Sequence, residues 1–186
     1  MFPINPLHQK CFVFGLQGGG KTYFAREMVK QNNLKVLVVS PHKHDFENEP
    51  DNFYLIKDFN PQLIDTYLSL AKQMCLKGIL DGIFCDELEM YFGSNILSPV
   101  KIDIMANHRH YRMSFIGISR RPQDIPTKLV ETGKYIVSFA LQGDNVKTKF
   151  NGIYKGMGEQ ILSLNYESFN YVLKEIGKPP IVCQKV

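Results

Sequence analysis

The 186-residue sequence has no internal repeat, no low-complexity tract and no linker-like segment. It also lacks an apolar run of the length, about 18–20 residues, that a membrane-crossing helix needs, and we predict no transmembrane segment. The opening residues, MFPINPLHQK, lack the apolar core of a secretory signal, so we expect no export by that route. Because a domain averages about 150 residues, we predict one domain over residues 1–186.

Cysteine is scarce and scattered. The four cysteines (Cys11, Cys75, Cys85 and Cys183) form no CxxC pair and have no metal-ligand spacing. This pattern excludes a disulfide framework and disfavours a structural zinc site. Three of the four lie inside apolar runs, as ordinary buried thiols do. We therefore predict a reducing, intracellular setting.

The composition, 44% apolar and 22% charged, excludes a disordered tail, a collagen-like fibre and a coiled coil. Short apolar runs alternate with segments of helical periodicity, the pattern of a parallel sheet covered by helices. We predict an α/β fold with a doubly wound, mostly parallel sheet. The expected strands are 11–14, 36–39, 83–85, 114–119, 135–141 and 169–173, and the expected helices are one from residue 21, then 61–78, 99–111 and 158–163.

A glycine-rich motif, GLQGGGKT, follows the first expected strand and opens the first helix. It matches the phosphate-binding pattern GxxxxGK[ST] in full and in the required context. Glycines let successive backbone N–H groups point at phosphate oxygens, and the helix N-terminus adds its positive end. Lys21 can bridge the β- and γ-phosphates, and the Thr22 hydroxyl can ligate Mg²⁺. The predicted nucleotide-binding residues are Gly15, Gln17, Gly18, Gly19, Gly20, Lys21 and Thr22.

A pair of acidic residues ends the expected strand 83–85. Asp86 at that strand end can hold Mg²⁺ through its water shell. A hydrolase also needs a carboxylate that positions the attacking water, and Glu87 is our candidate. A small nucleotide kinase needs no such carboxylate, so the pair favours hydrolysis. The alternative is that Asp86 and Glu87 are surface acids.

Read together, GLQGGGKT, GIFCDE and the later SRRPQDIP resemble the FtsK–HerA superfamily of P-loop ATPases, and within it the small genome-packaging ATPases of membrane-containing viruses. The resemblance implies a RecA-like fold, ATP and Mg²⁺ as cofactors, and ATP hydrolysis. It gives Ser119 the role of a γ-phosphate sensor at a strand end. Arg120 stands where glutamine is usual, and two roles remain open for it, phosphate contact or outward packing.

The resemblance also implies an arginine finger that each subunit donates to its neighbour's site. Arg109 matches that place best, and Arg112 is the alternative. Further implications are a homo-oligomeric ring, expected to be a hexamer, that moves double-stranded DNA into a preformed viral capsid. Capsid vertex or portal proteins would be further partners, and the host cytoplasm or procapsid vertex the location.

The charge distribution gives the DNA hypothesis limited support. Residues 101–155 hold ten basic and four acidic side chains, and we predict that basic residues there bind DNA phosphates. Within this stretch Lys147, Lys149 and Lys155, with Phe150 and Tyr154 between them, suggest either a DNA-facing loop or a solvated hairpin. By analogy with the related motors that the chain resembles, residues 91–99 are a candidate ring-lining loop.

Three other interpretations stay open. The chain could be a protein-assembly or secretion ATPase of a phage, a small nucleotide kinase, or a non-catalytic basic virion protein. The stretch His42-Lys43-His44 has no third ligand at a metal-binding spacing, which favours a polar surface loop.

Overall fold

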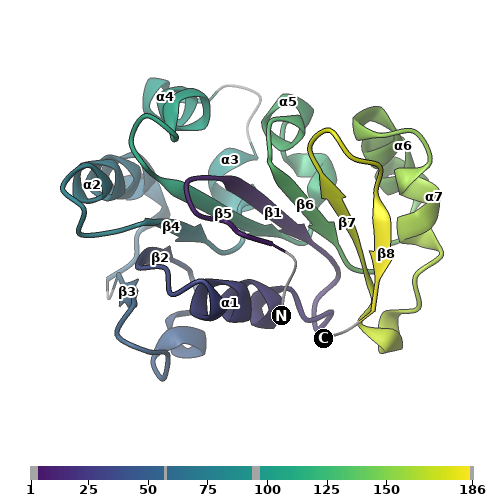
Figure 1. Cartoon of the computed structure of the whole chain (residues 1–186), viewed down its shortest axis with the longest axis horizontal. Helices are drawn as coiled ribbons and strands as arrows, with labels where there is room; N and C mark the ends of the chain where they lie inside the picture. The colour runs from purple at the N-terminus through teal and green to yellow at the C-terminus, as the bar shows by residue number, and fades with distance from the viewer. Residues whose placement is uncertain (1–3, 57, 94–96, 185–186) are drawn as a thin grey trace.

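The computed structural model describes residues 4–56, 58–93 and 97–184. Within these ranges eight strands form one sheet in the order β3-β2-β4-β5-β1-β6-β7-β8 (Figure 1). Strands β1 to β6 all pair in parallel, and β7 and β8 add an antiparallel edge. The strands are β1 (Lys10–Phe14), β2 (Val36–Val39), β3 (Phe53–Leu55), β4 (Gly82–Cys85), β5 (Ser114–Ser119), β6 (Tyr135–Ser138), β7 (Tyr171–Glu175) and β8 (Ile181–Cys183).

Helices cover both faces of the sheet, which confirms the predicted α/β class (Figure 1). Helix α1 lies against one face, and the remaining helices lie against the other. The helices are α1 (Lys21–Gln31), α2 (Ile64–Leu76), α3 (Glu89–Phe92), α4 (Pro99–Asn107), α5 (Thr127–Glu131), α6 (Asp144–Ile153) and α7 (Met157–Leu162). Among the described residues, no helix is both long and apolar enough to span a bilayer.

Strand β1 shows why the central strands are apolar throughout. Successive side chains of a strand point to opposite faces of the sheet. Phe12 and Phe14 pack into the core under α2 to α7, whereas Cys11 and Val13 pack into the core under α1. All four of these side chains are fully buried, so positions 11–14 of this strand require apolar residues on both faces.

Several predicted boundaries were wrong. Strand β6 ends at Ser138 instead of residue 141, because the next residues turn toward the glycine-rich loop, where the Ala140 carbonyl accepts a hydrogen bond from the Leu16 N–H. Helix α4 ends at Asn107 instead of 111, in a turn that leads to Arg112 with a left-handed φ of 53°. Strand β7 begins after Phe169, which is also left-handed, and runs to Glu175.

The short elements β3, α3, α5, α6 and β8 were not predicted. Helix α6 corrects the interpretation of residues 147–155 as a loop or hairpin, since Lys147 and Lys149 lie on that helix. Lys147 forms an ion pair with Glu159 at 3.3 Å, and the Lys149 Nζ donates to the Ile125 carbonyl. Of the predicted ring-lining loop 91–99, residues 94–96 lie outside the described residues.

The pairing of β4 with β5 depends on a strand residue without a side chain. A Cβ at Gly82 would lie 2.3 Å from the Ser114 carbonyl oxygen, whereas a Cβ at Gly152 in α6 would meet nothing within 4 Å. We expect Gly82→Ala to lower the free energy of unfolding by about 1–3 kcal/mol, because it forces the strands apart. Gly152→Ala is the matched control and should raise stability by up to about 1 kcal/mol, since alanine favours helix. Urea denaturation measures both, and equal effects would contradict the close approach.

Candidate active site

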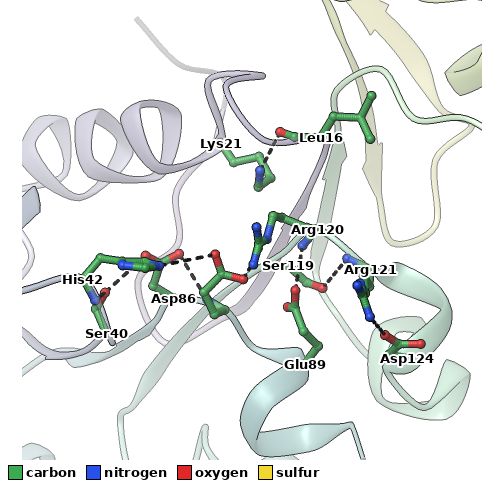
Figure 2. Close-up of polar contacts among 11 residues, drawn as sticks. Leu16, Lys21, Ser40, His42, Asp86, Glu89, Ser119, Arg120, Arg121 and Asp124 are labelled. Atoms are coloured by element: carbon green, nitrogen blue, oxygen red, sulfur yellow. Dashed lines mark hydrogen bonds and ion pairs between the residues drawn. The ribbon is translucent and has the colours of Figure 1, made fainter.

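The glycine-rich loop connects β1 to α1 as predicted, and two of its glycines have left-handed backbone. Gly18 has φ 74° and Gly20 has φ 87°, conformations that other residues adopt only with strain. Lys21 is the first residue of α1, and its Nζ donates to the Leu16 carbonyl of the same loop at 2.7 Å (Figure 2). Only 7% of Lys21 is exposed. Burial lowers the pKa of this ammonium, and the Glu87 and Asp86 carboxylates oppose that shift.

Asp86 follows the last residue of β4 and is held by two hydrogen bonds. Its Oδ2 accepts from the Ser40 hydroxyl at 3.2 Å, and its Oδ1 accepts from the Glu87 N–H at 3.1 Å (Figure 2). Burial raises the pKa of this carboxyl, and the two hydrogen bonds, together with Lys21 nearby, act in the opposite direction. Ser40 comes directly after β2, which is the neighbour of β4 in the sheet. The carboxylate is therefore fixed from two strand ends.

Glu87 has a left-handed backbone with φ 52°, a conformation that is strained for a residue with a side chain. Its Oε2 forms an ion pair with the Arg120 Nε at 3.0 Å, and its Oε1 lies 3.9 Å from the His42 Nε2. Burial raises the pKa of Glu87 most, followed by the nearby Glu89 carboxylate, and Arg120 opposes both effects. The backbone N–H of Arg120 also donates to the Glu89 Oε1 at 3.3 Å (Figure 2).

The side chains of Lys21, Asp86 and Glu87 line one cavity of about 420 Å³ at the carboxyl ends of the parallel strands. Of the predicted site residues, the cavity is lined by Gln17, Gly18, Lys21, Thr22, Asp86, Glu87 and Ser119. Gly15, Gly19 and Gly20 belong to the loop without lining the cavity. Four further residues line the cavity although the sequence analysis did not assign them to the site: His42, Asp45, Ile118 and Arg120. His42 follows β2, and the position of β2 beside β4 is the signal that could have placed it here.

The SRRP stretch forms the end of β5 and the turn after it. Ser119 is the last residue of β5, is 1% exposed, and its hydroxyl accepts from the Arg121 N–H at 3.0 Å. The side chain of Arg121 turns toward Asp124, with a 3.8 Å contact between Nη1 and Oδ2, and does not line this cavity (Figure 2). The two adjacent arginines thus face different surroundings, Arg120 toward the carboxylates and Arg121 toward the following turn.

A magnesium ion fits the donor set of the cavity. Within residues 4–56, 58–93 and 97–184, no three His, Cys, Asp or Glu side chains gather so that they could hold a metal by themselves. Mg²⁺ does not require such a group, since it is commonly held by one or two protein oxygens together with substrate phosphates and water. The Thr22 hydroxyl and the Asp86 carboxylate line the same cavity and supply oxygens of that kind.

A segment near the C-terminus also contacts the loop, which the sequence did not indicate. The hydroxyl of Tyr166 donates to the Gln17 carbonyl, and a Cβ at Gly18 would lie 2.7 Å from that hydroxyl. A Cβ at Gly20 would lie 3.3 Å from the ring of Phe169. Two aromatic side chains that precede β7 therefore limit the residues that the loop can accept.

Arg109 lies away from the cavity. Its Nη2 donates to the Oε1 of Gln9 at 3.2 Å, and Gln9 precedes β1. The cavity lies after the carboxyl end of β1, so the length of a strand, roughly 15–20 Å, separates the two places. Arg109 and the alternative Arg112 are both exposed and both precede β5. Neither arginine is brought to the cavity of its own subunit.

Some of the basic residues in 101–155 are paired with acidic residues of the same subunit. Several are engaged within the subunit, as Lys134 is with Glu175 at 2.8 Å and Lys147 with Glu159. Arg112, Lys128 and Lys155 are exposed and form no ion pair with the residues that the structure describes. The number of basic residues in this stretch therefore exceeds the number that are free to bind a negatively charged partner such as DNA.

A parallel sheet with a glycine-rich phosphate loop between β1 and α1 is the fold of the P-loop NTPases. No protein-family model matches the chain, and no curated protein matches its sequence. Among solved structures, the chain is similar to the genome packaging NTPase B204 from Sulfolobus turreted icosahedral virus 2, in complex with ATP-γS. That similarity has a TM-score of 0.84 at 12% identity and covers 98% of this chain and 100% of that one.

Two further similarities involve bacterial proteins. The cytoplasmic domain of the type VII secretion ATPase EccC from Thermomonospora curvata matches with a TM-score of 0.68 at 12% identity, over 95% of this chain and 25% of that one. The N-terminal domain of zonular occludens toxin from Neisseria meningitidis matches with a TM-score of 0.56 at 9% identity, over 97% and 94%. These similarities confirm, at the level of the fold, the resemblance predicted from the sequence motifs.

The turn that holds Arg109 contains a buried histidine and yields a prediction about pH. Burial, with a smaller effect from Lys10, lowers the pKa of His108 from 6.5 to about 4, and the side chain is 4% exposed. Between these values the unfolded chain binds a proton that the folded chain does not, so stability should fall as the pH drops from about 6.5 to about 4. Allowing for solvent screening, His108→Leu should remove about 1–2 kcal/mol of this pH dependence.

Urea denaturation at pH 7.5 and pH 5 tests this expectation. The exposed His110, on the same turn, supplies the control variant His110→Leu. If His108→Leu and the unchanged chain lose the same stability on acidification, His108 is not the group responsible.

Proposed function

We propose that the protein binds ATP with Mg²⁺ in this cavity and hydrolyses it. The observation that carries the proposal is that the phosphate loop residues Lys21 and Thr22 and the two carboxylates of Asp86 and Glu87 line one cavity. A neighbour with the same fold that was crystallised with ATP-γS supports the nucleotide assignment. The proposed enzyme is a single ATPase domain over residues 1–186.

In the proposed mechanism, the backbone of the loop binds the phosphates, and the Lys21 ammonium leaves the Leu16 carbonyl to contact the β- and γ-phosphate oxygens. Thr22 and Asp86 would hold Mg²⁺, and the bound ion would neutralise part of the phosphate charge. Glu87 accepts a hydrogen bond from the attacking water and takes its proton as the water oxygen bonds to the γ-phosphorus and the bond to the ADP oxygen breaks. The Ser119 hydroxyl, at the end of β5, contacts the γ-phosphate.

We propose that Arg109 acts in the site of a neighbouring subunit. Its place at the amino ends of the strands rules out a role in its own cavity, and its exposure makes it available to another copy. An arginine supplied in this way neutralises charge that develops in the transition state. Hydrolysis would then require assembly into a homo-oligomeric ring, for which we propose a hexamer. Arg112 remains the alternative donor.

We propose that the ring moves double-stranded DNA into a preformed viral capsid. The similarity to a genome packaging NTPase over nearly the full length of both chains supports this proposal. Exposed basic residues such as Arg112, Lys128 and Lys155 would contact the phosphate backbone with little sequence preference. The proposed location is the host cytoplasm or the vertex of the virion or procapsid, where capsid vertex or portal proteins would be partners.

The second candidate is an ATPase that moves proteins. The similarity to a type VII secretion ATPase favours it, although the TM-score is lower and the match covers only 25% of that chain. The two candidates predict different activators, since a packaging motor responds to DNA and a secretion ATPase does not.

ATP hydrolysis with and without double-stranded DNA is the direct test. We expect DNA to stimulate hydrolysis and added salt to reduce that stimulation, because phosphate contacts release counterions. Glu87→Gln should reduce the rate by about 100-fold or more without removing nucleotide binding. Lys21→Ala should abolish nucleotide binding. Hydrolysis that does not respond to DNA would favour the secretion ATPase.

Mixing two inactive variants tests the proposed arginine finger. Arg109→Ala alone should reduce hydrolysis by about 10³-fold. A mixture of Arg109→Ala with Glu87→Gln should recover activity, because some sites then combine an intact Glu87 with an intact Arg109 from the neighbour. Random assembly of equal amounts into a closed ring would give about a quarter of sites that are intact.

The same mixture with Arg112→Ala in place of Arg109→Ala is the matched control. If Arg112→Ala alone is inactive and its mixture with Glu87→Gln regains activity, Arg112 is the residue that acts in the neighbouring site. The absence of recovery with both variants would contradict a finger donated between subunits.

A further inference from the structure

Arg120 has a position that the proposed mechanism does not use. It follows Ser119 at the end of β5, lines the same cavity as Lys21 and Thr22, and forms the ion pair with Glu87. The geometry points to Arg120 as a residue that distinguishes a nucleoside triphosphate from a diphosphate within its own subunit. Glu87 is its partner in this structure, and we expect a γ-phosphate to replace Glu87 in that role. This inference rests on the proposed nucleotide site.

The ion pair fixes where the guanidinium lies. The Arg120 Nε is 3.0 Å from the Glu87 Oε2, and the Arg120 backbone N–H donates to the Glu89 Oε1 at 3.3 Å. The backbone is therefore anchored, so only the side chain has freedom to move. An arginine has five N–H donors, and a pair through Nε leaves the two terminal nitrogens with donors for a second acceptor.

The exposures of the two partners indicate which of them can move. The Glu87 side chain is 12% exposed, whereas the Arg120 side chain is 44% exposed. Glu87 is also restrained by its left-handed backbone. A change of partner would therefore be made by the guanidinium, which is accessible from the cavity, and Glu87 would stay in place.

Charge explains why a third phosphate group would attract Arg120. Asp45, Asp86 and Glu87 place three carboxyl groups in the lining of the cavity, and these repel an incoming phosphate. A terminal phosphate carries up to about two negative charges and several acceptor oxygens, more than the single charge of a carboxylate. Guanidinium also forms two parallel hydrogen bonds with phosphate oxygens. A diphosphate lacks the terminal group and would leave the Arg120–Glu87 ion pair intact.

The exchange has a consequence for Glu87. While it is paired with Arg120, one of its two carboxylate oxygens is occupied. When the guanidinium moves to the phosphate, that oxygen becomes available to accept a hydrogen bond from water. In this scheme the Oε2 of the proposed base becomes available only when a triphosphate is bound.

Equilibrium binding without hydrolysis tests this inference, using ADP and a non-hydrolysable ATP analogue, each with Mg²⁺. We expect Arg120→Gln to weaken binding of the triphosphate analogue by about 10-fold or more, the loss of a charge-assisted contact. ADP affinity should change by less than about 2-fold, because ADP lacks the partner group. Arg120→Lys keeps the charge and should recover part of the loss. Arg121→Gln removes the adjacent arginine, which faces Asp124, and should change neither affinity.

A double-mutant cycle with Glu87 tests the exchange itself. Glu87→Gln removes the competing carboxylate and should strengthen triphosphate binding. The increase in triphosphate affinity should be several-fold smaller when Glu87→Gln is made in the Arg120→Gln background, because that background has no guanidinium for Glu87 to hold. An equal gain in both backgrounds would overturn the exchange, and equal losses of ADP and triphosphate affinity in Arg120→Gln would overturn the discriminating role. Failure of the unchanged protein to bind either nucleotide would instead overturn the proposed function.

Discussion

Parallel pairing of β4, β5 and β1 is the constraint on which the site depends. Because these strands run in one direction, the segments that follow them all leave the same edge of the sheet. Phe14 is in register with Ser119, so the glycine-rich loop begins beside the SRRP turn, and Asp86 follows the neighbouring strand. Every side chain of β1 and β4 is buried, which fixes the register that holds these three segments together.

Charge at this edge is dense, and the acidic side chains outnumber the basic ones. Three acidic residues follow β4, while Lys21 and Arg120 approach from the other two segments. Each cation has a partner within the subunit, Lys21 the Leu16 carbonyl and Arg120 the Glu87 carboxylate. Under the proposed function, both cations would exchange these partners for phosphate oxygens. The order of the strands brings these charged side chains together, and the proposed chemistry depends on that proximity.

The sequence predicted the parts of the structure that local pattern determines. Apolar runs identified the buried parallel strands, and GLQGGGKT identified the loop, because both signals lie within a few consecutive residues. Strand β8 was missed because Ile181 and Val182 are each 54% exposed and do not form a buried run. Helix α6 was missed because it is short and its buried stripe has only Val146 and Phe150. The Ser40–Asp86 and Arg120–Glu87 contacts join residues 46 and 33 positions apart, beyond the reach of any local pattern.

The proposed role of Arg109 in a neighbouring site would restrict how copies of the chain associate. Arg109 lies at the amino ends of the strands and the loop at their carboxyl ends, so a contact that joins them uses two different faces of the subunit. Such a head-to-tail contact has no two-fold axis and adds subunits in one direction. It closes when the rotation between neighbours divides a full turn evenly, and otherwise it continues as an open helical filament. The angle between neighbours, rather than the strength of their contact, thus decides whether a finite particle forms.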